Sequence, residues 1–175
     1  ERGITATTAS TFRLGVVSNP LPGHGKFQNF LSVPYLDHLN RPLTIRFRCY
    51  QEHDHRSMGH GKYMSTSHDP ARPFNIRAIH EAEDEIHVTE GEFDAITLSQ
   101  IGLPAIAIPG ATGWRTVHRR MLAGSSRVWV WGDPDDAGAQ FTQAVTRSLR
   151  QAKGIRMPVG MDVNMFDTLL PHMPV

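Results

Sequence analysis

The chain has 175 residues but only one cysteine, Cys49. One cysteine excludes an internal disulfide framework and a Cys₄ zinc ribbon, and it fits a reducing cytoplasm. No run of about 18 apolar residues occurs, so we expect no membrane-spanning helix. The net charge of +1 argues against a uniformly basic nucleic-acid binder.

The charges are unevenly distributed along this nearly neutral chain. Between residues 41 and 80 there are seven Lys or Arg residues against three acids. Between residues 81 and 94 there are seven acids and no Lys or Arg, and between 115 and 127 four arginines and no acid. A basic half beside an acidic centre suits a polyanion held against bound metal, although solvated charged faces on an ordinary domain give the same pattern.

From residue 86 onward, strand-like and helix-like patterns alternate. We expect strands at 86–89, 105–108, 127–131 and 155–157. Helices are expected at 92–101, around 114–121, at 136–152 and at 164–170. This order is typical of βαβ units with right-handed crossovers, and it predicts an α/β fold with a parallel sheet.

The residues before 86 have a different character. Residues 1–24 are predicted to be a loosely organised leading segment or linker, with one strand around 12–17. Residues 25–85 carry short β-type runs between turns rich in Gly and His. In the run 43–49, alternation gives one apolar face and one basic face, which carries Arg46 and Arg48. We therefore divide the chain into residues 1–24, 25–85 and 86–175.

The first acidic motif, Glu90 to Asp94, directly follows the expected strand at 86–89. Glu90 ends the strand, Gly91 permits a tight turn, and Asp94 falls in the first helical turn. Parallel sheets place their ligand sites at the carboxyl ends of their strands. Either acid could bind metal through water, or Glu90 could exchange protons. An acidic turn that satisfies the helix dipole gives the same pattern.

The second acidic motif, Asp133 to Gly138, follows the strand at 127–131. Asp133 and Asp135 occupy alternate positions in an extended loop, so they point to the same side and can share cations. Asp136 is expected to cap the next helix, and Gly138 to let a substrate approach the backbone. Mg²⁺ usually takes one or two carboxylates together with water and phosphate oxygens, which matches this sparse set. A capped turn with surplus acids is the alternative.

Together the two motifs closely resemble the TOPRIM module of bacterial and phage DnaG-type primases, topoisomerases and some nucleases. The E-G-x-x-D and D-x-D-x-A-G forms are similar to the primase versions, and residues 160–164 resemble a late acidic element of phage-type primases. Upstream, residues 61–65 are similar to a primase K-Y-L motif whose lysine is Lys62 here. The resemblance implies a parallel-sheet βαβ TOPRIM domain, residues 86–175, preceded by a smaller mixed α+β basic subdomain, residues 25–85.

The resemblance also implies roles for individual residues. The expected catalytic residues are Glu90, Lys62 and Asp133. The expected ligands of two or more Mg²⁺ or Mn²⁺ ions are Glu90, Asp94, Asp133, Asp135 and Asp162. The expected nucleic-acid or nucleotide contacts are Arg46, Arg48, Lys62, Arg72 and Arg77. A compact ammonium such as that of Lys62 suits a triphosphate, and alternating arginines can follow template phosphates; both could also be solvated surface.

A further cluster consists of Cys49, His53, His55 and His60. These residues could in principle hold Zn²⁺. Their spacings of four, two and five residues are irregular for a structural site, so we expect no zinc in this chain.

The leading functional hypothesis is a DNA primase catalytic core that makes short RNA primers on single-stranded DNA from ribonucleoside triphosphates. Expected further partners are a replicative helicase and a separate zinc-binding domain, with no membrane. The expected location is the cytoplasm at the replication fork, or the host cytoplasm if a phage encodes the chain. Two alternatives stay open: a metal-dependent TOPRIM nuclease, and a non-catalytic replication accessory that binds single-stranded DNA.

Overall fold

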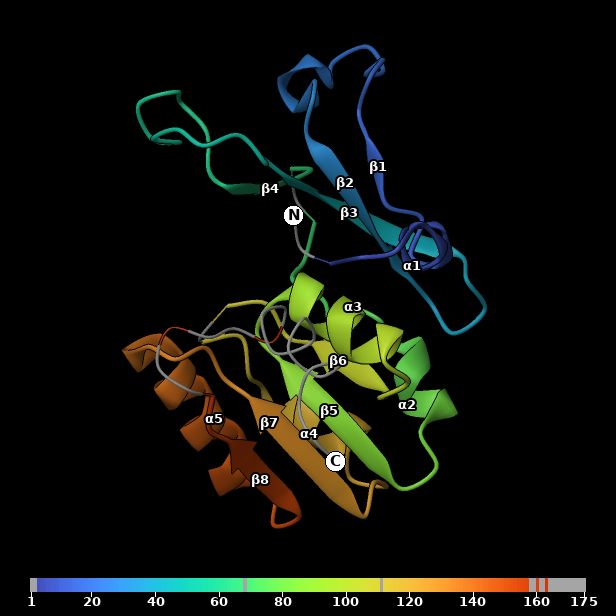
Figure 1. The fold of residues 1–175 in the computed structure, drawn as a ribbon, viewed down its shortest axis with the longest axis vertical. Coiled ribbons are helices and arrows are strands. Elements are labelled where there is room, and N and C mark those ends of the chain that lie inside the picture. The colour runs from blue at the N-terminus through green and yellow to red at the C-terminus, as the bar shows by residue number, and fades with distance from the viewer. Residues whose placement is uncertain (1–2, 68, 111, 158–159, 161–162, 164–175) are drawn as a thin grey trace. The chain divides into compact units, whose positions relative to one another are not determined.

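The chain forms two compact units, each built around its own sheet (Figure 1). A computed structural model describes residues 3–67, 69–110, 112–157, 160 and 163. The first unit is Ala6–Pro70. The second contains residues 3–5 and the described residues from Ala71 onward. The two units meet after Pro70, whereas the sequence predicts a functional boundary after residue 85. The predicted boundary divides the chain differently and stays a prediction.

The first unit is a four-stranded antiparallel sheet with strand order β1-β2-β3-β4. Its elements are α1 (Ala6–Thr11), β1 (Gly15–Val16), the 3₁₀ helix η1 (Gly25–Phe27), β2 (Leu31–Leu36), β3 (Pro42–Arg48) and β4 (Tyr63–Ser65). Helix α1 lies in the segment expected to be loosely organised, whereas β1 falls within the strand predicted around 12–17 and pairs with β2. The pattern did not predict α1 because this helix buries no residue and so has no apolar periodicity.

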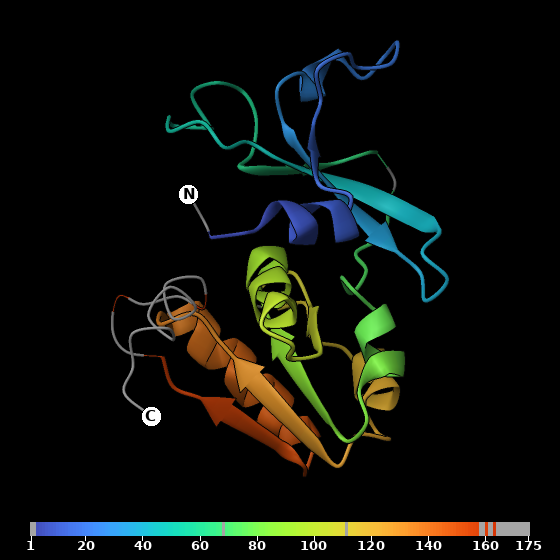
Figure 2. The same cartoon turned by 45° about the vertical axis from the view of Figure 1, so that its right-hand side comes forward.

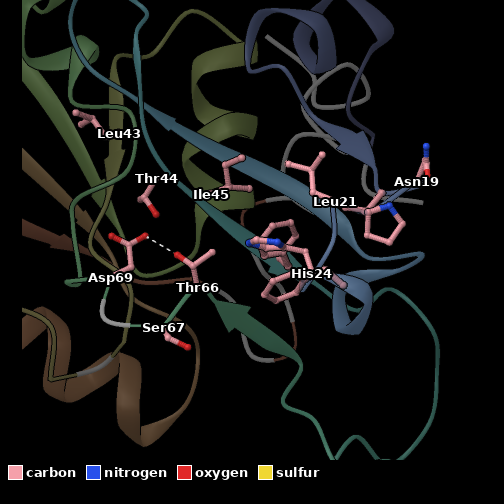
Figure 3. A pocket seen from close by; sticks show the side chains of 13 residues that line it. Asn19, Leu21, His24, Leu43, Thr44, Ile45, Thr66, Ser67 and Asp69 are labelled. Atoms are coloured by element: carbon pink, nitrogen blue, oxygen red, sulfur yellow. Dashed lines mark hydrogen bonds between the residues drawn. The ribbon is translucent and has the colours of Figure 1, made fainter.

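Aromatic side chains form the core of the first unit. Phe27, Phe30, Phe47 and Cys49 are buried together, and the rings of Phe27 and Phe47 stack with centroids 3.8 Å apart. The apolar face of β3 continues into a surface groove of about 610 Å³, where Leu43 and Ile45 are exposed (Figure 3). Thr66 donates a hydrogen bond to Asp69 beside it. The groove is mostly apolar, so it does not resemble a phosphate site.

The second unit is a four-stranded parallel sheet with order β6-β5-β7-β8, which confirms the predicted α/β fold (Figure 2). Its elements are α2 (Arg77–Glu81), β5 (Glu85–Thr89), α3 (Glu92–Gln100), β6 (Ala105–Ala107), α4 (Thr116–Met121), β7 (Arg127–Trp131), α5 (Asp136–Ser148) and β8 (Ala152–Ile155). The last strand begins three residues earlier than predicted, and α5 ends four residues earlier. Lys153 and Gly154 give this edge strand no apolar run to mark it. The helix predicted at 164–170 lies outside the described residues.

The connections run in opposite directions from the two central strands. From β5 the chain passes through α3 to β6 on one side, and from β7 it passes through α5 to β8 on the other. The carboxyl ends of β5 and β7 therefore form the topological switch point, where open α/β sheets bind ligands. The two strands pair in register, with Thr89 opposite Trp131 at that end.

Apolar burial holds this pairing together. Ile86 and Val88 of β5 pack beside Val128 and Val130 of β7 in a cluster that also includes Phe141 of α5. Residues before β5 take part in the same unit: Ala78 is in this cluster, and Phe74 forms a β-bridge with Ala107. In the described part of the chain, no helix combines the length and the apolar character needed to cross a bilayer.

A buried hydrogen bond joins the central strands on the opposite face of the sheet. Trp131 Nε1 lies 2.9 Å from His87 Nδ1 and donates to it. Burial lowers the pKa of His87 to about 4, so its ring is neutral at pH 7. Because the unfolded pKa is higher, near 6.5, the contribution of His87 to stability is present above pH 6.5 and is lost as the pH falls toward 4.

We expect the variant His87→Gln to lose less stability than the wild type between about pH 7 and about pH 5, by on the order of 1 kcal/mol. Gln keeps an acceptor for Trp131 but does not titrate. Urea unfolding followed by tryptophan fluorescence measures this, because all three tryptophans lie in the second unit. Equal losses in the two proteins would contradict the assignment.

Candidate functional site

The structure brings the two acidic motifs together at the switch point. Glu90 directly follows β5 and is half-buried, while Asp133 follows β7 by two residues and is exposed. The backbone N–H of Asp133 donates to Glu90 Oε1 across 3.4 Å. Residues 43 positions apart in the chain therefore share one edge of the sheet, as the strand-end argument predicts.

The electrostatics of this edge favour a bound cation. Burial and the nearby Asp133 carboxylate raise the pKa of Glu90 to about 6, with a smaller contribution from Asp135, while the N–H of Asp133 opposes the increase. The ionised carboxylates therefore repel one another in the folded chain. A hard divalent cation would relieve that repulsion.

Asp135 has a structural role at this edge. It caps α5: its Oδ1 accepts a hydrogen bond of 2.8 Å from the N–H of Gly138. The expectation that Asp136 caps the helix is wrong, because Asp135 has the extended backbone of a cap and Asp136 is already the first helical residue. The cap bond holds the Asp135 carboxylate in a fixed orientation through Oδ1.

Close contact between the start of α5 and the loop before it explains why the second motif contains Gly138. A Cβ atom added to Gly138 would collide with the backbone of Asp133, and one added to Gly132 would collide with the carbonyl of Gly138. The first turn of α5 therefore packs directly on the loop that carries the acids. Gly138 accommodates this packing, and its predicted role in letting a substrate approach the backbone stays a prediction.

The first motif has a similar constraint. Asp94 is buried in the first turn of α3, and a Cβ atom added to Gly91 would collide with its Oδ2. The side chain of Asp94 thus folds back over the turn that follows Glu90. Glycine at position 91 leaves room for that carboxylate, and a larger residue there would require the Asp94 side chain to shift.

The described carboxylates fit a sparse magnesium or manganese site. They supply hard oxygen donors, and burial, together with repulsion from Asp133, raises the pKa of Glu90. Among the described residues, no three of these acids come close enough to chelate one ion by themselves. This agrees with the habit of Mg²⁺ of keeping waters and taking only one or two carboxylates. The fifth predicted ligand, Asp162, lies outside the described residues.

A surface hollow of about 570 Å³ lies beside the second acidic motif. Asp133 and Asp135 line it, together with residues of α5 and of the end of β8. Arg156 also lines the hollow and is exposed. Arg156 was not among the predicted site residues, because the edge strand before it has too few apolar residues to reveal a strand end there.

The predicted basic contacts are divided between the two units. In the first unit, the guanidinium carbons of Arg46 and Arg48 lie 4.8 and 5.2 Å from the centre of the Tyr63 ring. Arg48 is buried and donates a hydrogen bond of 2.9 Å to the Tyr63 hydroxyl, whereas Lys62 is exposed. Tyr63 therefore holds both arginines on one side of β3. Their nucleic-acid roles stay predictions.

Two other predicted contacts belong to the second unit. Arg77 forms an ion pair with Glu81 one helical turn later, with Nε and Oε1 2.9 Å apart. Arg72 is partly buried before α2. A nucleic-acid role for either arginine stays a prediction.

Comparisons with known proteins agree with this geometry. The Toprim-like family matches residues 87–167, which include both acidic motifs. The Gene 57 protein of Mycobacterium phage D29 is 36% identical over 125 residues, covering 71% of this chain and 78% of the phage protein.

Solved primase structures share the fold. The zinc-binding and RNA polymerase domains of the Aquifex aeolicus primase match with a TM-score of 0.72 and 19% identity, over 97% of this chain and 51% of that one. The RNA polymerase domain of Mycobacterium tuberculosis primase DnaG, in complex with a double-stranded DNA oligomer with a 6-nucleotide overhang, matches with a TM-score of 0.71 and 16% identity, over 98% and 69%. This chain spans only 66%, 65% and 51% of three of the primase chains that it matches.

We expect Glu90→Gln to stabilise the ion-free protein at about pH 7.5, because it removes a carboxylate that is unfavourable in its ionised form. After discounting for the half-exposed side chain, the gain is roughly 1 kcal/mol, or roughly 2–4 °C in melting temperature. The same change should reduce the stabilisation that Mn²⁺ gives to the wild type. Thermal unfolding with and without Mn²⁺ measures both effects.

The control for this experiment is Glu83→Gln, which removes an exposed carboxylate before β5. It should change neither the melting temperature nor its response to Mn²⁺. A destabilised Glu90→Gln variant with an undiminished Mn²⁺ response would contradict the assignment of Glu90 to a cation site.

Proposed function

This chain belongs to the Toprim-like family, and we propose that it is the catalytic core of a DNA primase, which synthesises short RNA primers on a single-stranded DNA template. The observation that carries the proposal is the position of Glu90 beside Asp133 at the switch point of the parallel sheet. The fold of DnaG primase catalytic cores supports it.

The proposed substrates are ribonucleoside triphosphates and a DNA template. A primase relative with this fold has been solved with DNA, which supports the choice of template. Within the first unit, Arg46 lies against Tyr63 and is partly exposed, so it could contact template phosphates. Arg48 is buried, so its predicted contact would require its side chain to move away from Tyr63. Lys62 is exposed and could contact a triphosphate.

The proposed chemistry is nucleotidyl transfer. Two Mg²⁺ or Mn²⁺ ions, when bound, supply positive charge that stabilises the attacking 3′-oxygen and the departing pyrophosphate. Asp133 and Asp135 would hold the ions, with Asp135 oriented by its bond to Gly138. Glu90, whose pKa is raised to about 6, could accept the proton of the 3′-hydroxyl, since it is mostly ionised at pH 7 yet more basic than an ordinary glutamate.

The larger assembly is part of the same proposal. A zinc-binding domain for template selection and a replicative helicase are proposed as partners, because one solved relative carries a zinc-binding domain with its RNA polymerase domain and another is a fragment of a primase-helicase protein. We place the activity in the cytoplasm, at the replication fork.

The direct test is incorporation of labelled ribonucleotides on single-stranded DNA with Mn²⁺, resolved on a gel. We expect short RNA products from the wild type and a loss of roughly 100-fold or more in Asp133→Ala, since a metal-site carboxylate is removed. The control is Asp84→Asn, an exposed position at the amino end of β5, which should keep activity within roughly twofold.

Two outcomes would replace the proposal. Degradation of the template without any nucleotide, lost in Asp133→Ala, would assign the same carboxylates to a nuclease. DNA binding by the wild type without synthesis or cleavage would favour the non-catalytic accessory.

A further inference from the structure

Four metal-binding side chains converge in the connection between β3 and β4. Cys49 directly follows β3, His53 and His55 lie in the loop, and His60 lies three residues before β4. Each offers one ligand atom, and the four atoms all lie within 4.8 Å of one another. Of the groups of three or more His, Cys, Asp or Glu side chains in the described part of the chain, this is the one close enough to hold a metal ion.

The shortest separations match a tetrahedral zinc site. Zn–N and Zn–S bonds of roughly 2.05 and 2.3 Å at tetrahedral angles place two nitrogens about 3.3 Å apart and a nitrogen and a sulfur about 3.6 Å apart. The Nε2 atoms of His53 and His60 are 3.2 Å apart, and His53 Nε2 lies 3.7 Å from Cys49 Sγ. Both separations from His53 Nε2 therefore already match those between ligands of one ion.

The hydrogen bonds leave histidine nitrogens of the cluster available to bind a metal ion. His60 Nδ1 lies 3.1 Å from the carbonyl oxygen of Gly61. A carbonyl only accepts, so Nδ1 carries the proton and Nε2 keeps its lone pair, which is the usual arrangement for a histidine that binds metal. His55 Nδ1 is buried and has no hydrogen-bond partner in the structure. A metal ion would satisfy that atom.

Turn hydrogen bonds shape this loop, such as those that the carbonyl of Asp54 accepts from Met58 and Ser57, but its large apolar side chains add no burial. Its thirteen residues from 50 to 62 contain no helix or strand, and its large apolar side chains, Tyr50 and Met58, are exposed. Ordered loops of this length without secondary structure are uncommon and usually functional. The loop is closed at its base by the N–H of Cys49, which donates to the carbonyl of Lys62, while His55 and His60 are joined by a backbone hydrogen bond.

We propose that Cys49, His53, His55 and His60 bind one Zn²⁺ ion in a closed structural site of the first unit. One thiolate and three imidazoles fill a tetrahedral shell and leave no open position for catalysis. The hard ions Mg²⁺ and Mn²⁺ prefer oxygen ligands, so this site and the acidic site select different metals. The proposal reverses the expectation drawn from the irregular sequence spacing.

The ion would link the loop to the core of the first unit. Cys49 belongs to the buried aromatic cluster with Phe27 and Phe47, and the ring of His60 meets that of Phe30 edge-on at 5.2 Å. Both Arg48 and Lys62 adjoin the ends of the loop, so zinc would fix the backbone next to two predicted nucleic-acid contacts. The site does not depend on the primase proposal, because its ligands and its readout are separate from the acidic motifs.

The test measures bound metal and its coordination. We expect elemental analysis of the protein, dialysed after addition of Zn²⁺, to give about one zinc per chain. Cobalt substitution should give an intense visible spectrum of tetrahedral Co²⁺ with a thiolate-to-metal charge-transfer band. Cys49→Ser should lose that band, and both Cys49→Ser and His55→Gln should lose most of the bound metal.

The variants make the outcome unambiguous. Because Cys49 is buried in the core, His55→Gln, at a partly exposed position, keeps the test valid if Cys49→Ser fails to fold. His24→Gln, at an exposed histidine in the same unit, should keep the zinc. Metal-free wild-type protein, an octahedral cobalt spectrum, or zinc retained in His55→Gln would each overturn the proposal, and none of these results depends on RNA synthesis.

Discussion

The parallel pairing of β5 with β7 is the constraint on which the candidate active site depends. It sets Thr89 opposite Trp131, so that the residues after both strands emerge at one edge. Glu90 and Asp133 are thereby held close although their charges repel. Fully buried valine and isoleucine side chains on the same strands supply the opposing free energy, at about 25 cal/mol for each Å² of apolar surface removed from water.

The apolar patterns located β5 and β7, whereas helices α1 and α2 were not predicted and β8 was predicted three residues too late. Strands β5 and β7 carry continuous apolar runs followed by acids, so their positions and their parallel arrangement could be inferred. Helix α1 buries nothing and β8 is an edge strand containing Lys153 and Gly154, so neither carries a periodic signal. The choice between Asp135 and Asp136 as helix cap depends on one backbone angle, which residue type alone does not determine.

The Cys and His cluster illustrates a different limit of sequence reasoning. Spacing rules for metal sites describe ligands that a short local motif brings together. Here the convergence depends on the pairing of β3 with β4, which brings the two ends of a long loop into register. The irregular intervals therefore describe the path of the loop and say little about the distances between side chains.

Asp135 is both a helix cap and a candidate metal ligand, and this affects how substitutions near the acidic site should be interpreted. Its carboxylate caps α5, and α5 packs on the loop through Gly132 and Gly138. Replacing Asp135 would therefore loosen the helix start and shift the neighbouring acids, in addition to removing an oxygen ligand. Loss of activity in an Asp135 variant would therefore reflect both a disturbed helix start and a missing ligand. Asp133 caps no helix, so loss of activity in an Asp133 variant reports more directly on the chemistry of the site.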